Sequence, residues 1–264
     1  MLAWHAVFRG DRNELTVSFL DIGQGDSIFI ESPGGTQVLV DAGPDKDVLR
    51  ELGKVMPFYD RSIDVVIATH PDADHIGGIP DVLKRFKVGL YIETDLQKEG
   101  GVFDEIHRVL DEKKIRRFTV DHRSEMLVDH RVLFDILFPV VSTKGFESNT
   151  SSIVLHIAYG DRSFMLTGDS PKRIERYLVL VYGDLLQSDV LKAGHHGSRT
   201  SSDELFAKTV APEYVVISAG CDNRYGHPHK EVIDLFENLG SIISRTCGEG
   251  TITFTTDGSF LQRK

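Results

Sequence analysis

The order in which strands and helices are predicted along this chain constrains its fold more than any other feature. Three short β runs come first, at 15–21, 26–32 and 36–41, and a Ser-Pro-Gly-Gly turn separates the second from the third. Strands and helices then alternate. Helices are predicted at 45–58, 79–86 and 101–113, and strands at 63–68, 88–93 and 115–119.

The second half of the chain repeats this order loosely. Strands are predicted at 131–138, 151–158, 163–167, 190–193, 214–218, 241–246 and 250–256, and helices at 171–181, 202–210 and 229–238. Because a β-meander followed by β/α alternation occurs twice, we expect an α/β protein of two sheets packed face to face with helices outside. No internal repeat, Pro-rich linker or long charge block divides the chain, so we expect one domain over 1–264, in which 1–14 form a short N-terminal stub.

Composition excludes several classes of protein. The 264 residues are 41% hydrophobic and 27% charged, which is typical of a soluble globular protein, and no apolar run is long enough to cross a membrane. The net charge of −10 argues against a passive nucleic-acid binder but not against a phosphate-cleaving enzyme whose metal ion supplies positive charge. We expect Cys221 and Cys247 to be free thiols, although one bridge between them is possible.

One segment concentrates residues that bind divalent cations. His70, Asp72, Asp74 and His75 directly follow a predicted buried strand, and the first three alternate, so an extended backbone places them on one face. Imidazole together with carboxylate suits zinc, manganese or iron. The alternative is a polar loop in which one Asp caps the next helix.

Three further segments place similar groups after predicted strands. Asp169 follows the strand at 163–167, and its alternative role is to cap the helix that begins near Pro171. His195 and His196 lie between glycines, where the alternative is a structural pair packed under a loop. His227 precedes a proline, so its backbone is extended and it caps no helix; His229 is expected to face solvent.

Together these motifs resemble the metallo-β-lactamase superfamily. The His70-x-Asp72-x-Asp74-His75 block is similar to that family's His-x-His-x-Asp-His signature, with Asp72 in place of the second histidine. Leu20–Asp26, Leu166–Asp169, Gly194–Ser198 and Tyr225–Pro228 occur in the order found in the metallo-β-lactamase-like domain of ComEC-type DNA-internalisation competence proteins. The resemblance runs from about Leu15 to Thr256.

The resemblance implies a four-layer αββα sandwich that holds one or two divalent ions, Zn²⁺ or Mn²⁺ with Mg²⁺ as a further option. It implies His70 and Asp72 as ligands at one position, Asp74, His75 and His227 at the other, and Asp169 as the bridge. Most relatives have another histidine where this chain has Asn149, so the first position is richer in oxygen, which favours manganese or magnesium over zinc.

Other residues near these motifs receive supporting roles. Asp74 or Asp169 is expected to orient or deprotonate water, and His195 or His196 to protonate the leaving group or bind phosphate. The expected substrate contacts are Asn149, Lys192, Ser198 and Arg224. Hydrogen-bond support for the ligands is expected from Asp21, Gln24, Asp26 and Asp41. Turn formation is the alternative for the acids, and an ordinary surface charge is the alternative for Lys192, Arg199 and Arg224.

Three functions remain open. The first is a metal-dependent phosphodiesterase or nuclease that acts on DNA during competence-type uptake, with a membrane channel domain as partner. The second is a metallohydrolase of a lactone, thioester or phosphoester, and the third is a non-catalytic DNA-uptake module with a degenerate site. As part of a ComEC-type protein the domain would face the extracytoplasmic side; as a free-standing chain without a signal peptide it would be cytoplasmic.

Overall fold

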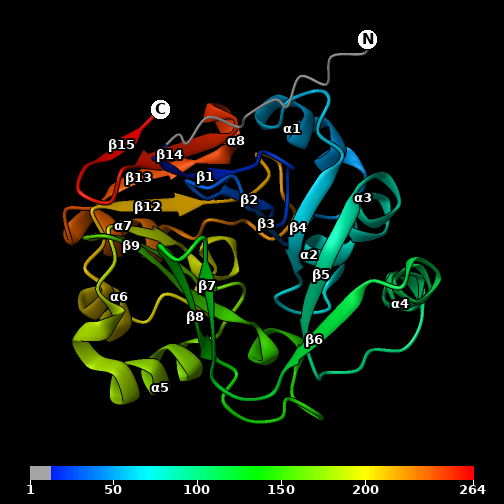
Figure 1. The fold of residues 1–264 in the computed structure, drawn as a ribbon. Helices are drawn as coiled ribbons and strands as arrows, with labels where there is room; N and C mark the ends of the chain where they lie inside the picture. The colour runs from blue at the N-terminus through cyan, green and yellow to red at the C-terminus, as the bar shows by residue number, and fades with distance from the viewer. Residues whose placement is uncertain (1–12) are drawn as a thin grey trace.

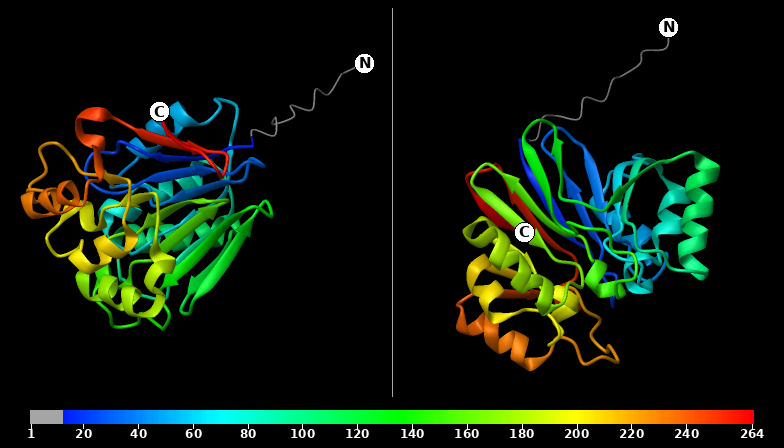
Figure 2. Two further views of the ribbon diagram at one scale, coloured as in Figure 1. Left: turned by 90° about the vertical axis from the view of Figure 1, so that its left-hand side faces the viewer. Right: turned by 90° about the horizontal axis from the view of Figure 1, so that it is seen from below.

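Two β-sheets form the centre of the molecule, and helices cover their outer faces (Figures 1 and 2). The computed structural model describes residues 13–264. The larger sheet has the order β15-β14-β1-β2-β3-β4-β5-β6, and the smaller has the order β13-β12-β11-β10-β9-β8-β7. The predicted α/β class with two packed sheets is confirmed. The predicted stub at 1–14 lies almost entirely outside the described residues.

The strands of the larger sheet come from both ends of the chain. They are β1 (Leu15–Phe19), β2 (Ile28–Glu31), β3 (Gln37–Val40), β4 (Ser62–Ile67), β5 (Lys87–Thr94), β6 (Arg116–Val120), β14 (Ile252–Thr256) and β15 (Leu261–Arg263). The smaller sheet contains β7 (Ser124–Val128), β8 (Val132–Phe138), β9 (Val154–Tyr159), β10 (Arg162–Leu166), β11 (Val190–Lys192), β12 (Tyr214–Ile217) and β13 (Ile242–Arg245).

The helices connect these strands. The α-helices are α1 (Asp47–Val55), α2 (Ala73–Ile76), α3 (Ile79–Arg85), α4 (Gly101–Lys113), α5 (Lys172–Tyr182), α6 (Glu204–Val210), α7 (Lys230–Asn238) and α8 (Thr246–Glu249). Three 3₁₀ turns, η1 (Ser148–Ser151), η2 (Gly183–Leu186) and η3 (Gly194–Gly197), complete the chain. None of the helices within 13–264 combines the length and apolar character that crossing a bilayer requires.

Three apolar layers hold the four structural layers together. The central one lies between the sheets, where side chains such as Phe19 and Phe254 of one sheet meet Phe164 of the other. A second layer joins α1, α3 and α4 to the larger sheet, and a third joins α5, α6 and α7 to the smaller sheet. Successive strand residues point to opposite faces, so each inner strand contributes to two layers. The expected αββα sandwich follows from this division.

Strand direction explains where functional residues gather. β3 through β6 run parallel, as do β10 through β13, and β1 runs parallel to β3 because both pair antiparallel with β2. The carboxyl ends of parallel strands meet at one edge of a sheet, which is where ligand sites usually open. The loops after β1, β3, β4, β10, β11 and β12 therefore converge.

Several details differ from the sequence predictions, among them the short helices α2 and α8, which were not predicted. β7 and β15 are strands that were not predicted; both lie at sheet edges, and their short sequences carry little apolar alternation. The expectation of two free thiols was wrong, because Cys221 and Cys247 form a disulfide. This bond ties the loop after β12 to α8, two segments that only the tertiary fold brings together.

Candidate metal centre

The loop after β4 turns directly into the short helix α2. His70 and His75 are buried, whereas the side chains of Asp72 and Asp74 are each about one third exposed. Asp72 occupies the N-cap position of α2, but its side chain does not cap the helix; it accepts a hydrogen bond from Lys98 Nζ at 2.8 Å instead. The helix-cap alternative for this segment is therefore not what the structure shows.

A glycine lets another loop approach this turn closely. Gly25 has φ +124°, and a Cβ on it would lie 2.0 Å from the carbonyl oxygen of Asp74. Only glycine fits at such a position. The close approach allows the amide of Asp26 to donate to the same carbonyl at 3.2 Å, and so places the Asp26 carboxylate under the histidines.

Four side chains from three loops meet at the centre of this edge, and we call Asp74, His75, Asp169 and His196 the inner cluster. His75 Nε2 lies 3.2 Å from Asp169 Oδ1, and His196 Nε2 lies 3.6 Å from Asp169 Oδ2 and 3.3 Å from Asp74 Oδ2. His75, Asp169 and His196 are buried. His195 and His196 have left-handed backbones, with φ of 49° and 56°, in the tight turn that aims the His196 ring inward.

The donor atoms of this cluster fit a metal ion. His75 Nε2, His196 Nε2, Asp169 Oδ1 and the neighbouring His70 Nε2 are buried, and none has a hydrogen-bond partner among residues 13–264. Buried polar atoms almost always have partners, so unpartnered ones that face one another require an explanation. Imidazole nitrogens and carboxylate oxygens within this spacing are suitable ligands for a divalent transition metal.

Two more acids, Asp41 and Asp26, lie on the Nδ1 sides of the inner-cluster histidines. Asp41 Oδ2 lies 2.7 Å from His75 Nδ1 and also accepts from the Thr69 hydroxyl at 2.7 Å. Asp26 Oδ1 lies 3.4 Å from His196 Nδ1, whose better-placed partner is the Ser218 carbonyl at 2.9 Å. Ligand atoms of Asp26, His75, Asp169 and His196 all lie within 4.8 Å of one another. Asp26, however, faces the Nδ1 sides of the rings, so it orients the histidines rather than sharing their Nε2 side.

A fully buried lysine neutralises Asp26. Lys192 Nζ forms an ion pair with Asp26, donates to the Gly168 carbonyl at 3.2 Å and lies 3.9 Å from Asp169 Oδ1. Burial opposes ionisation of Asp26, but Lys192 and His196 outweigh it and lower the Asp26 pKa to about 2. Lys192 is thus an internal counter-ion, and its predicted contact with substrate is wrong because the side chain does not reach the surface.

The neighbouring charges shift the pKa values of the histidines in different directions. Burial opposes protonation of His75 and His196, but Asp169 and a second acid near each ring outweigh this effect. The pKa of His75 is therefore raised well above its usual value, and the pKa of His196 is raised to about 9. Burial and the neighbouring His75 lower the pKa of His70 to about 3. Asp169 is surrounded by imidazoles, which outweigh its burial and hold its pKa well below the usual range. The acids of the inner cluster are therefore anionic near neutral pH.

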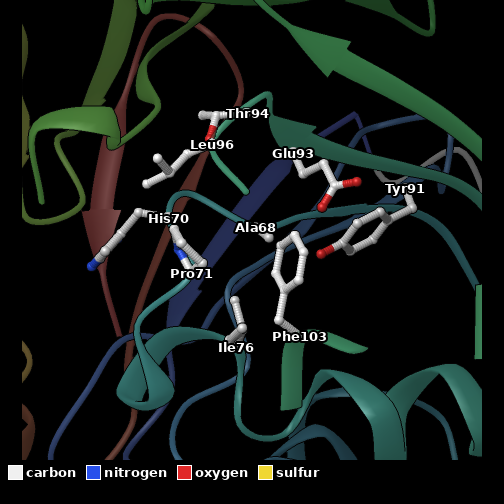
Figure 3. A pocket seen from close by; sticks show the side chains of 9 residues that line it. All are labelled: Ala68, His70, Pro71, Ile76, Tyr91, Glu93, Thr94, Leu96 and Phe103. Carbon is white, nitrogen blue, oxygen red and sulfur yellow. The ribbon is translucent and has the colours of Figure 1, made fainter. Parts of the chain in front are cut away.

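We call His70, Asp72, Asn149 and His195 the outer cluster, which also adjoins Asp169. His70 Nε2 is 3.7 Å from Asp72 Oδ2 and 3.9 Å from Asp169 Oδ2, and His195 Nε2 is 3.6 Å from the same Asp169 oxygen. Asn149 Nδ2 lies 3.4 Å from His195 Nδ1. Figure 3 shows side chains that line a small cavity beside His70, among them Tyr91 and Glu93. The volume of this cavity is about 10 Å³. That is room for one water molecule.

Several other predicted site residues lie beside the two clusters or beyond them, without joining either one. His227 was expected as a ligand, but its ring stacks on Tyr225, and its centroid lies 5.4 Å from that of His195. The position beside Asp74 and Asp169 that was expected for His227 is occupied by His196. Arg224 is bonded to the Tyr225 hydroxyl at 2.8 Å and is exposed. His229, expected to face solvent, is partly buried, and its Nδ1 accepts from the Arg199 amide at 3.2 Å.

The remaining predicted residues support loops. Asp21 accepts from the Gly23 amide at 3.4 Å and holds a turn. Gln24 accepts from the Gly220 amide at 3.3 Å and so joins the loop after β1 to the loop after β12. Ser198 is buried, with its hydroxyl 3.0 Å from that of Thr200. Thr69 and Lys98, which contact the site, were not predicted from the sequence. Their signal was weak, since a threonine beside a histidine and a lysine in a loop are common.

Comparisons with known proteins agree with this geometry. A model of the metallo-beta-lactamase superfamily matches residues 20–220. The chain is 34% identical to ComE operon protein 3 of Bacillus subtilis, over 92% of this chain and 33% of that protein, and 32% identical to competence protein ComA of Neisseria gonorrhoeae, over 92% and 32%. It spans about a third of the length of these relatives.

Among solved structures, the metallo-beta-lactamase fold protein YhfI from Bacillus subtilis superimposes with a TM-score of 0.61 at 14% identity, over 92% of this chain and 100% of that one. That likeness concerns the fold alone. The family model, the two competence-protein relatives and the histidine–aspartate clusters at the shared sheet edge lead to one conclusion: the chain belongs to the metallo-β-lactamase superfamily.

Proposed function

We propose that this protein is a metal-dependent phosphodiesterase that cleaves DNA during competence-type DNA uptake. The observation that carries the proposal is the group of buried donor atoms without hydrogen-bond partners around Asp169. The competence proteins that resemble this chain support DNA as the substrate.

We assign the ligands by the cluster to which they belong. The inner cluster would hold one ion through Asp74, His75 and His196, with Asp169 shared, which replaces the initial assignment of His227. His70, Asp72 and the amide oxygen of Asn149 would hold a second ion. Three of these four outer donors, counting Asp169, are oxygen atoms, which favours Mn²⁺ or Mg²⁺ over Zn²⁺ at that position. Bound there, such ions would polarise a phosphoryl oxygen, lower the pKa of water and stabilise the leaving oxygen.

The side chains around the ions have separate tasks in this proposal. Burial opposes ionisation of Asp74, but the neighbouring His196 and the charge of His75 outweigh it and lower the pKa of Asp74, so Asp74 stays ionised and can orient water. His195 is partly exposed, and burial lowers its pKa, so its neutral ring can donate a hydrogen bond from Nε2 to a phosphoryl oxygen while Thr200 engages Nδ1 at 2.9 Å. His227 and Arg224 lie in the next loop, where they can contact more distant parts of the substrate.

We further propose that the domain works at the extracytoplasmic face of the membrane beside a channel domain. The competence-protein relatives are about three times as long as the matched segment, which leaves room for such a domain in them. The Cys221–Cys247 disulfide supports this location, because disulfides persist in oxidising compartments.

Cleavage assays test the proposal directly. Purified protein is incubated with single- and double-stranded DNA and Mn²⁺, Mg²⁺ or Zn²⁺, beside the His70→Ala and Asp169→Asn variants. We expect metal-dependent cleavage by the wild-type protein and loss of cleavage in both variants. Absence of cleavage with every metal would reject the nuclease. Metal content below about one tenth of an equivalent, not restored by Mn²⁺, would favour a non-catalytic module with a degenerate site.

The net charge of −10 favours a second candidate, a hydrolase of small lactones, thioesters or phosphoesters, because a strongly acidic surface repels a polyanion. Turnover of such esters without turnover of DNA would establish it in place of the nuclease.

A further inference from the structure

A groove opens next to the outer cluster. Its volume is about 560 Å³, and Asp169, Asn149 and His195 form part of its wall. The rest is formed by η1, the first turn of α5 and Thr200. Since Asp169 belongs to both the groove and the candidate metal centre, a chain that reaches the centre can continue along the groove.

Two cationic side chains line the α5 end of this groove, where they offset its two acids, Glu147 and Asp169, in a protein that is acidic as a whole. Lys172 and Arg173 begin α5 and line the wall. The Arg173 guanidinium is held by the Thr150 hydroxyl and by Glu147 Oε2 at 3.1 Å, yet its side chain is 60% exposed. The guanidinium is therefore oriented over the groove and remains accessible to a ligand.

The backbone adds to this charge. α5 has eleven residues, its N-cap is Pro171, and no side chain caps it. The amide of Lys172 donates to the Thr200 carbonyl at 3.0 Å, which fixes the start of the helix against the far wall. The positive end of a helix dipole favours anions, and here it coincides with two cationic side chains.

We propose that this groove binds the phosphodiester backbone of a single DNA strand next to the scissile bond, with Lys172 and Arg173 as the phosphate contacts. This inference rests on the proposed function and names the residues that select a polynucleotide. A volume of about 560 Å³ is in the range of clefts that hold one small ligand, so it suits one or two nucleotides of one strand. Phosphate would take the place of Glu147 on Arg173, because both bind guanidinium through oxygen pairs.

Fluorescence anisotropy of a labelled oligothymidylate tests the groove without catalysis. The full chain is titrated in EDTA over a series of NaCl concentrations, and Lys172→Gln/Arg173→Gln is compared with Arg85→Gln/Lys87→Gln. The control pair removes the same charge from the α3–β5 junction, where Arg85 and Lys87 are exposed. Each lost phosphate contact lowers the salt slope by about 0.7 for single strands, so the groove variant should lose about 1.4 in slope and about 25-fold in affinity at about 0.1 M NaCl.

The control variant should keep the wild-type affinity, and Glu147→Gln should bind more tightly because Arg173 is released. The inference would be overturned if the two double variants bound the oligonucleotide with equal affinity, whether or not both had lost affinity. It would also be overturned if the wild-type protein did not bind. Circular dichroism of each variant establishes that it is folded. If binding depends on Lys172 and Arg173 while the metal-loaded wild type cleaves neither DNA nor bis(p-nitrophenyl) phosphate, the groove stands and the nuclease proposal fails.

Discussion

The inner and outer clusters share Asp169 but differ in how firmly their side chains are held. In the inner cluster His75 is bonded to Asp41, and His196 to the Ser218 carbonyl, both at buried positions. In the outer cluster Asp72 is paired with Lys98, and both side chains are substantially exposed. The inner histidines are thus held by buried partners, whereas Asp72 of the outer cluster is held only by an ion pair that is open to solvent.

The cations beside the two clusters give the sharpest contrast. Lys192→Met leaves Asp26 buried without its partner, so we expect the free energy of unfolding to fall by about 3–5 kcal/mol. Lys98→Met removes an exposed ion pair and should cost less than about 1 kcal/mol. Urea unfolding of both metal-free variants measures the difference. Similar losses would show that the inner cluster does not depend on its buried cation.

Replacing Asp169, which adjoins both clusters, should weaken metal binding at both of them. We expect Asp169→Asn to weaken Mn²⁺ binding more than 100-fold, because even partners outside the ligand set typically contribute 10–100-fold. Isothermal titration calorimetry measures affinity and stoichiometry. Asp135→Asn, which changes an acid paired with Arg123 instead, is the matched control. Unchanged stoichiometry in Asp169→Asn would contradict the idea of a shared ligand.

A change behind the inner cluster should have a smaller effect. Asp41→Asn removes the anion that orients His75, and we expect Mn²⁺ affinity to fall about 10–100-fold while the fold persists. Asp21→Asn is the control, because Asp21 holds only the turn at Gly23. Equal Mn²⁺ affinities of the two variants would mean that the ring of His75 is oriented by packing alone.

The smallest effect is expected from restoring a histidine in the outer cluster. Asn149→His replaces a neutral amide by imidazole, so the ratio of Mn²⁺ affinity to Zn²⁺ affinity should fall. We expect a change of less than about 10-fold, which is the smallest loss of Mn²⁺ affinity expected for Asp41→Asn. Competition titration with the two metals measures the shift. A shift towards Mn²⁺ would place Asn149 outside the ligand set.

Much of the fold was predictable because its strands and helices carry strong local patterns. α4 was predicted with its observed bounds, and β4 to within a residue at each end. β15 was not predictable, since three residues at a sheet edge carry no usable periodicity. The disulfide could not be inferred either, because Cys221 and Cys247 are joined by the packing of separate loops.

The candidate site was only partly predictable for a similar reason. His70 to His75 lie together in the sequence, so their convergence follows from one turn. The choice between His196 and His227 depends on the left-handed backbone at His195 and His196, which residue type does not reveal. Lys192 did carry a signal: it stands in an apolar strand between Leu191 and Ala193, where a surface lysine is unusual.

The ammonium group of Lys192 also bears on whether this region needs a metal ion in order to fold. A cluster of acids that relied on an ion alone would repel itself until that ion arrived, as in small metal-dependent domains that are unfolded without metal. Here the ammonium group of Lys192, which is part of the chain itself, lies beside Asp26, Asp169 and the Gly168 carbonyl. The fold of this region therefore does not depend on a bound metal ion to offset Asp26.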